Sequence, residues 1–270
     1  MIRPVPTFDV HRHLWPEQFL EALARREAPP RFRGSTLELE RQGSFELELR
    51  AYSLESCLEA LDRDGIDAAV ISLAPSLELA RQAGGRIRPL AAARVLEGFA
   101  GATVAADALL DLDGLSALLD ELTGHGGVLF VHPGPCDPPR DAPPWWSALV
   151  DYTAQMQAAY AAWLASGAGR WPDVPVIFAI LAGGGPFQIE RLRSRDFDVR
   201  RTLLPNVYFE TASYGRRALE LCLATFGVRQ LLYGSDGPVI DSQPTLRDVR
   251  GFGQAVADAL CRDNPTRLFE

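Results

Sequence analysis

The 270-residue chain contains no lysine, and all 27 of its basic residues are arginine. This absence excludes three kinds of chemistry: a phosphate-binding P-loop, a Schiff base on a lysine amine, and a carbamylated lysine that bridges two metals. Arginine cannot replace lysine in these roles, because its guanidinium group stays protonated. The chemistry of this chain must therefore come from other side chains or from a bound cofactor.

Long apolar runs and blocks of like charge are also absent. The apolar stretches are short, the net charge is −8 and the pI is about 5.1. We therefore expect no membrane span and no nucleic-acid partner. Because no signal-peptide pattern opens the sequence, we expect a cytoplasmic protein. The four cysteines show no CxxC spacing, so we expect free thiols and no disulfide framework.

Short apolar runs alternate with helical patterns along nearly the whole chain. The apolar runs are expected to be strands, and they cover residues 7–11, 68–74, 87–95, 98–106, 127–132, 175–181, 206–210 and 230–236. Helices are expected at 16–27, 53–65, 111–124 and 143–165 and after each of the last three strands. Such strands are typical of a parallel sheet that is covered on both faces. The sequence therefore predicts an α/β fold, a (β/α)₈ TIM barrel forming a single domain over residues 1–270. A doubly wound sheet is the alternative, disfavoured because no GxGxxG follows the first strand.

Residues 36–50 interrupt this alternation. Their sequence, TLELERQGSFELELR, alternates apolar and polar positions on both sides of Gln42-Gly43. A period of two on either side of a turn predicts a β-hairpin. We expect it as a small insertion after the first strand, before the next helix of the barrel.

Histidine is scarce, and three of the four histidines fall at predicted carboxyl ends of strands. His11 and His13 end the first strand, where residues i and i+2 point to the same side. His132 ends the fifth strand and Asp236 ends the eighth. TIM barrels carry their active sites at this end, so the four side chains are expected to converge. His125 precedes the fifth strand, at the opposite end, and is expected to be structural or exposed.

Three imidazoles and one carboxylate suit a single divalent metal ion. These nitrogen and oxygen donors favour Zn²⁺, with Mn²⁺ or Co²⁺ as alternatives. Taken singly, each histidine would be interpreted as a hydrogen-bonded core residue. The convergence of three histidines and an aspartate favours the metal site.

Four stretches of the sequence resemble the amidohydrolase-related family, the amidohydrolase 2 group. They are DVHRHLWP, FVHPG, LYGSDGP and the closing NPTRLF, and together they span the chain. The group includes small-molecule hydrolases, lactonases and non-oxidative decarboxylases similar to aminocarboxymuconate semialdehyde decarboxylase. The resemblance implies a distorted (β/α)₈ barrel with one divalent metal. By resemblance, His11, His13, His132 and Asp236 match the metal positions.

One family feature is missing. The family usually has a histidine at the end of the sixth strand, in a stretch resembling HAGGG, and this chain reads AILAGGGPF with Leu181 or Ala182 in its place. Three interpretations follow. Another group, Asp236 or Glu210, serves as the base; or the reaction needs no activated water, as in decarboxylation; or the site is catalytically silent and binds a ligand. For Glu210, a surface or salt-bridged carboxylate is the alternative to a catalytic role.

Aromatic and arginine side chains near the expected mouth are candidates for substrate binding. Trp15 and Trp145, together with the hairpin, could form an aromatic lid over a planar ligand, or could pack beneath long loops. Arg216, after the seventh strand, could hold a substrate carboxylate, or could be solvated.

From the sequence we expect a metal-dependent hydrolase acting through a metal-activated water on a small, carboxylated or cyclic molecule. The alternatives are a non-oxidative decarboxylase of a small aromatic or unsaturated acid, and a silent ligand-binding protein. The expected partner is a small-molecule substrate, and a homodimer is the candidate assembly.

Overall fold

The fold comes from a computed structural model, which describes residues 5–73, 77–92, 97–196, 198 and 204–270. Its main sheet has eight parallel strands in the order β1-β5-β6-β7-β8-β9-β10-β11. The strands are β1 (Phe8–His13), β5 (Ala68–Leu73), β6 (Ile87–Ala91), β7 (Gly101–Ala105), β8 (Val128–His132), β9 (Val176–Phe178), β10 (Val207–Glu210) and β11 (Leu231–Leu232). Each of them falls on a strand that the sequence predicts.

The two ends of this sheet meet and close it into a barrel. The N–H of Val10 donates to the carbonyl of Tyr233 at 2.9 Å, and the N–H of His13 donates to the carbonyl of Gly237 at 2.8 Å. These bonds join β1 to the segment that follows β11. An open doubly wound sheet leaves its edge strands apart, so the closure rules out that alternative and confirms the barrel.

Aromatic side chains fill both sides of the barrel wall. Phe130 of β8 lies inside, with its ring centroid 5.0 Å from that of His11. Phe178 and Phe209 contact Tyr160 on the outer side, each with ring centroids 5.4 Å apart. The three phenylalanines are fully buried. Burying a side chain of this size stabilises the fold by about 1.5–3 kcal/mol.

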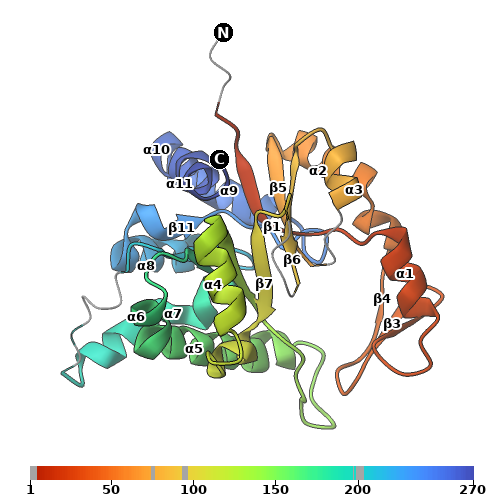
Figure 1. Ribbon diagram of the computed structural model, residues 1–270, viewed down its shortest axis with the longest axis horizontal. Helices are drawn as coiled ribbons and strands as arrows, with labels where there is room; N and C mark the ends of the chain where they lie inside the picture. The colour runs from red at the N-terminus through yellow and green to blue at the C-terminus, as the bar shows by residue number, and fades with distance from the viewer. Residues whose placement is uncertain (1–4, 74–76, 93–96, 197, 199–203) are drawn as a thin grey trace.

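Helices lie outside the strands of the main sheet (Figure 1). They are α1 (Glu17–Ala24), α2 (Leu54–Asp64), α3 (Leu77–Gln82), α4 (Ser116–His125), α5 (Tyr152–Ala162), α6 (Ala168–Arg170), α7 (Ile180–Arg193), α8 (Arg216–Phe226), α9 (Gln243–Gly251), α10 (Gln254–Asp258) and α11 (Asn264–Phe269). Between β6 and β7 the described residues carry no helix. None of the described helices is both long and apolar enough to cross a bilayer.

The predicted helix over 143–165 is longer and less regular than expected. A π-helical segment over Ser147–Asp151 precedes α5, and a second one over Trp163–Gly167 follows it before α6. By contrast, α2 agrees closely with the helix predicted over 53–65. The Ser53 hydroxyl accepts the N–H of Ser56 at 3.2 Å to cap its start.

A second, antiparallel sheet is inserted between α1 and α2. It contains β2 (Arg31–Arg33), β3 (Thr36–Leu39) and β4 (Gly43–Glu46), and Figure 1 shows it beside α1 at the edge of the molecule. The β3–β4 pair is the predicted hairpin. β2 adds a third strand outside the predicted range, and the hairpin ends before residue 50 because Leu49–Tyr52 form a short 3₁₀ helix.

Candidate metal centre

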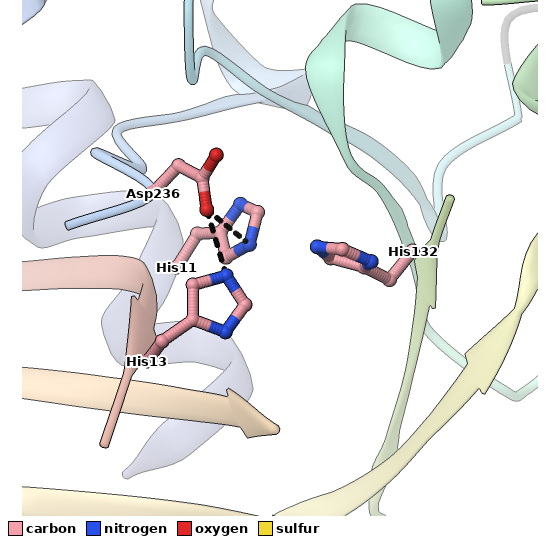
Figure 2. Close-up of side chains that lie close together, drawn as sticks. All are labelled: His11, His13, His132 and Asp236. Carbon is pink, nitrogen blue, oxygen red and sulfur yellow. Dashed lines mark hydrogen bonds and ion pairs between the residues drawn. The ribbon is translucent and has the colours of Figure 1, made fainter. Parts of the chain in front are cut away.

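Three strand ends place the four candidate ligands at one mouth of the barrel. His11 and His13 come from β1, His132 is the last residue of β8, and Asp236 lies four residues beyond β11. One nitrogen or oxygen atom from each lies within 4.8 Å of the others. Figure 2 shows His11, His13 and Asp236 grouped together, with the His132 ring directed at them from across the mouth. The convergence expected from the sequence is present.

The contacts of the three imidazoles leave their Nε2 atoms facing this centre. His132 Nδ1 lies 2.8 Å from the Pro133 carbonyl, to which its N–H donates. His13 Nε2 lies 2.7 Å from Asp236 Oδ1, and His11 Nε2 lies 3.5 Å from the same oxygen. Among the described residues, the side-chain contacts of Asp236 with His11 and His13 use Oδ1. Its Oδ2 therefore remains available for another partner.

The electrostatics of the group favour a positive charge at its centre. Burial disfavours the charged form of His11, but the Glu210 and Asp236 carboxylates outweigh it and raise the His11 pKa to about 9. Burial together with the charges of His11 and His13 lowers the pKa of His132 to about 3. Burial acts to raise the pKa of Asp236, but the charge of His11 and the hydrogen bond from His13 outweigh it and lower this pKa to about 2. A proton on His11 thus supplies a positive charge where the carboxylates favour one.

The donor set fits one divalent metal ion. Both ring nitrogens of His11 are buried and make no hydrogen bond in the described part of the chain, and Nε2 is the one that lies near Asp236 at the centre. Leaving buried polar atoms unpaired costs free energy, which a cation coordinated by His11 Nε2 would offset in part. Neutral imidazole and carboxylate are ligands for Zn²⁺ and Mn²⁺ alike.

Glu210, the second candidate base, is fully buried behind the centre. Its Oε1 accepts the N–H of Ile180 at 2.7 Å and lies 3.3 Å from His11 Nδ1. Its Oε2 accepts the N–H of Ala212 at 3.0 Å. Both oxygens are engaged, so Glu210 is a salt-bridged carboxylate and not a surface one. Of the two candidate bases, only Asp236 keeps an oxygen free at the mouth among the described contacts.

The backbone is unusual in the stretch where the resemblance implies a histidine and this chain has Leu181 or Ala182. The predicted strand over 175–181 stops at Phe178, and Ile180, Leu181 and Ala182 have φ values of 45°, 51° and 52°. Gly183 and Gly184 continue the left-handed turn. This conformation disfavours side chains with a Cβ, by about 1–2 kcal/mol for each residue. Leu181 is buried in the core, 2% exposed.

The predicted substrate-binding residues lie in three different settings. Trp15 stacks on Tyr52 with ring centroids 4.0 Å apart, and its Nε1 is buried without a hydrogen bond among the described residues. Trp145 is 57% exposed. Arg216 pairs with Glu220 at 3.0 Å and lies over the Phe252 ring, so its contacts are with helical residues outside the barrel. The structure brings none of the three into the ligand cluster.

Two tyrosines that the sequence analysis missed lie within reach of the charge on Asp236. Burial and the Asp236 carboxylate raise the pKa of both Tyr52 and Tyr152. Gln42, at the tip of the inserted hairpin, donates to the Tyr152 hydroxyl at 3.1 Å. The hairpin therefore reaches the helix that follows β8. No local motif marks these tyrosines, because the packing of the insertion brings them to the mouth.

His125 and the cysteines follow the sequence-based expectation. His125 is the last residue of α4 and precedes β8, so it lies at the opposite end of that strand from His132. All four cysteines are free.

Comparison with known proteins agrees with this architecture. The chain belongs to the amidohydrolase family, whose sequence pattern it matches over residues 10–270. This match confirms the resemblance noted in the sequence. A comparison with proteins of curated function found no match.

Several solved structures share the fold over nearly the whole chain. An IDCase from Metarhizium anisopliae has a TM-score of 0.82 at 19% identity, covering 99% of this chain and 97% of its own. The 5-carboxyvanillate decarboxylase of Sphingomonas paucimobilis has a TM-score of 0.75 at 13% identity, with 98% and 99% covered. A dihydroxybenzoic acid decarboxylase from Polaromonas sp. JS666, solved with bound manganese, has a TM-score of 0.70 at 16% identity, with 98% and 97% covered.

Proposed function

We propose that this protein is a metal-dependent, non-oxidative decarboxylase of a small aromatic or unsaturated carboxylic acid. The observation that carries the proposal is Leu181 in the stretch where the resemblance implies a histidine, together with an Asp236 whose Oδ2 has no contact among the described residues. Hydrolysis needs a base for the attacking water, whereas decarboxylation needs a proton delivered to carbon. Two of the related structures described above are decarboxylases by name, and one of them binds manganese, which supports the same reaction class.

His11, His13, His132 and Asp236 would hold the metal. A divalent ion bound there supplies positive charge that orients an acidic substrate and stabilises the negative charge that develops during the reaction. We expected Zn²⁺ from the donor set, and the manganese in two related structures makes Mn²⁺ an equal candidate.

The proton is carried by Asp236 in this proposal. Its pKa of about 2 means that it is ionised before substrate enters. Its free Oδ2 accepts the acidic proton of the entering substrate. As the bond between the carboxyl carbon and the neighbouring carbon breaks, that pair of electrons stays on the neighbouring carbon and takes the proton from Oδ2. The products are carbon dioxide and the substrate with hydrogen in place of its carboxyl group.

Aromatic walls would exclude water and orient a planar acid. Tyr52 and Tyr152 both lie within reach of the charge of Asp236. Trp15 stacks on Tyr52, and Gln42 of the inserted hairpin contacts Tyr152. A planar ring can stack on such walls while its carboxylate faces the ligand cluster.

Carbon dioxide release tests the proposal. The protein loaded with Mn²⁺ or with Zn²⁺ is incubated with a panel of hydroxylated aromatic acids and unsaturated diacids, and with lactones and activated esters for comparison. We expect carbon dioxide from at least one acid and no turnover of the lactones. Hydrolysis of a lactone or ester without any carbon dioxide would contradict the proposal and restore the hydrolase predicted from the sequence.

A further inference from the structure

Glu210 contacts the candidate metal centre from behind. We infer that it is a positioning residue, which orients His11 for the metal and holds the left-handed turn in place. The inference rests on the metal site that the proposed function requires. It differs from the role of base that the sequence allows for this residue.

The contacts of Glu210 account for both of its oxygens. Oε1 lies 3.3 Å from His11 Nδ1 and accepts the Ile180 N–H at 2.7 Å, while Oε2 accepts the Ala212 N–H at 3.0 Å. The side chain is 0% exposed. A buried carboxylate is costly unless it is paired and hydrogen-bonded, and these three partners supply the pairing. With both oxygens engaged inside the wall, it has none to offer a substrate.

The His11 contact fixes which nitrogen can bind a metal. A hydrogen on Nδ1 that faces the Glu210 carboxylate leaves the lone pair on Nε2, the nitrogen that lies 3.5 Å from Asp236 Oδ1 at the centre. A carboxylate behind a metal-binding histidine orients the ring and strengthens it as a ligand. His132 has a backbone carbonyl in the same role, so the two imidazoles are held by groups of different charge.

The same Oε1 atom also accepts a hydrogen bond from the turn that contains Leu181 and Ala182, where the resemblance implies a histidine. Ile180, whose N–H it accepts, opens the run of positive φ values through Leu181 and Ala182. From the other side, Gln157 donates to the Gly183 carbonyl at 2.6 Å. A strained backbone persists only where its surroundings hold it from several sides. One atom of Glu210 thus joins this turn to a metal ligand.

Space around Glu210 is tight enough to hold its geometry. A Cβ built on Gly234 would lie 2.1 Å from Glu210 Oε2 and 2.9 Å from the His11 Cβ. The absence of a side chain at Gly234 is therefore what lets the carboxylate reach its position beside His11.

Metal affinity of Glu210→Gln tests the inference. The glutamine amide has only one oxygen, so its N–H₂ group would face at least one of the three N–H donors that Glu210 now accepts from or pairs with. At least one of these donors would then lose its partner. We expect the affinity of the metal-free protein for Mn²⁺, measured by calorimetry, to fall about 10- to 100-fold. The matched control is Asp64→Asn, another buried carboxylate, whose partners are Ser242, Gln243 and Arg63. It should change Mn²⁺ affinity less than about threefold.

Nuclear magnetic resonance supplies a second measurement that needs no variant. In the Zn²⁺-loaded wild-type protein labelled with ¹⁵N-histidine, His11 should carry its hydrogen on Nδ1 and bind through Nε2. The opposite tautomer would overturn the inference even if Glu210→Gln fails to fold.

The outcomes separate this inference from the proposed function. Wild-type affinity in Glu210→Gln, or an equal loss in Asp64→Asn, overturns the positioning role while the metal site stands. A wild-type protein that binds no metal overturns both. A protein that binds metal as described and releases no carbon dioxide overturns only the proposed reaction.

Discussion

Asp236 combines two roles in this account, metal ligand and proton carrier. Asp236→Asn keeps a side chain of the same shape and removes the oxygen that accepts a proton. We expect turnover to fall by about 10²- to 10⁴-fold, the usual contribution of a proton-transferring group. Much of the metal should remain, because three imidazoles still form a site. Metal analysis and carbon dioxide assays on the same sample check this, and full turnover in the variant would disprove the role.

Leu181 or Ala182 stands where the sequence resemblance implies a histidine, and a substitution at Leu181 tests that difference. Leu181→His restores an imidazole there, and histidine tolerates a positive φ better than most residues. We expect metal binding to be unchanged and slow hydrolysis of an activated ester to appear, because a base becomes available for water. A variant that loses its metal would show that the restored imidazole disturbs the ligands. The rate of ester hydrolysis is measured by fluorimetry in Leu181→His and in Leu181→Asn, which serves as the control.

Residue-level prediction from sequence succeeded where a local rule applied. His11, His13, His132 and Asp236 are brought together because carboxyl ends of parallel strands meet in a barrel. Whether they bind metal stays a prediction. Two partners of Glu210 could not be predicted from local sequence, because Ile180 lies after β9 and His11 lies in β1, both far from Glu210 along the chain.

At the scale of elements, the segment after β11 is held between β1 and β10 with little spare volume. Gly234→Ala adds a Cβ that would overlap Glu210 Oε2 and press on His11. Overpacking of this kind usually costs about 1–3 kcal/mol. We expect a lower melting temperature and weaker metal binding. Gly124→Ala, at a helical position with open space around it, is the control and should lower neither. Unchanged metal affinity in Gly234→Ala would mean that the turn adjusts freely.

The positions of the eight strands were predicted more accurately than the residues at which they end, and more accurately than the inserted sheet. The eight apolar runs mark strands because both faces of the sheet are covered. The last run ends early in β11 because the chain turns toward the mouth, with Asp236 at a φ of 59°. β2 was missed because three residues, Arg-Phe-Arg, are too few for their polar-apolar-polar order to indicate a strand. These residues form a strand because they pair with β3 in an antiparallel ladder.

For the whole molecule, metal binding should depend on pH in a defined direction. His11 has a raised pKa of about 9 in the metal-free protein, so below pH 9 a metal must displace its proton. His132 and Asp236, with pKa values of about 3 and 2, release none in this range. Affinity should therefore rise with pH through the neutral range and level off near the His11 pKa of about 9. Calorimetry at neutral pH in buffers of different ionisation enthalpy should detect about one proton released for each ion bound. An affinity that stays constant across the neutral range would contradict this charge state.

The central claim is that the four ligands form one metal site on the folded chain. Calorimetric titration of the metal-free protein with Mn²⁺ tests it most directly, with His132→Ala as the site variant and His125→Ala as the control. We predict one ion bound per chain in the wild type and in His125→Ala, with a higher melting temperature in each, because a ligand that binds only the folded state stabilises it. His132→Ala should bind far more weakly. A wild-type protein that binds neither Mn²⁺ nor Zn²⁺, or a His132→Ala variant that binds as tightly as the wild type, would contradict the account.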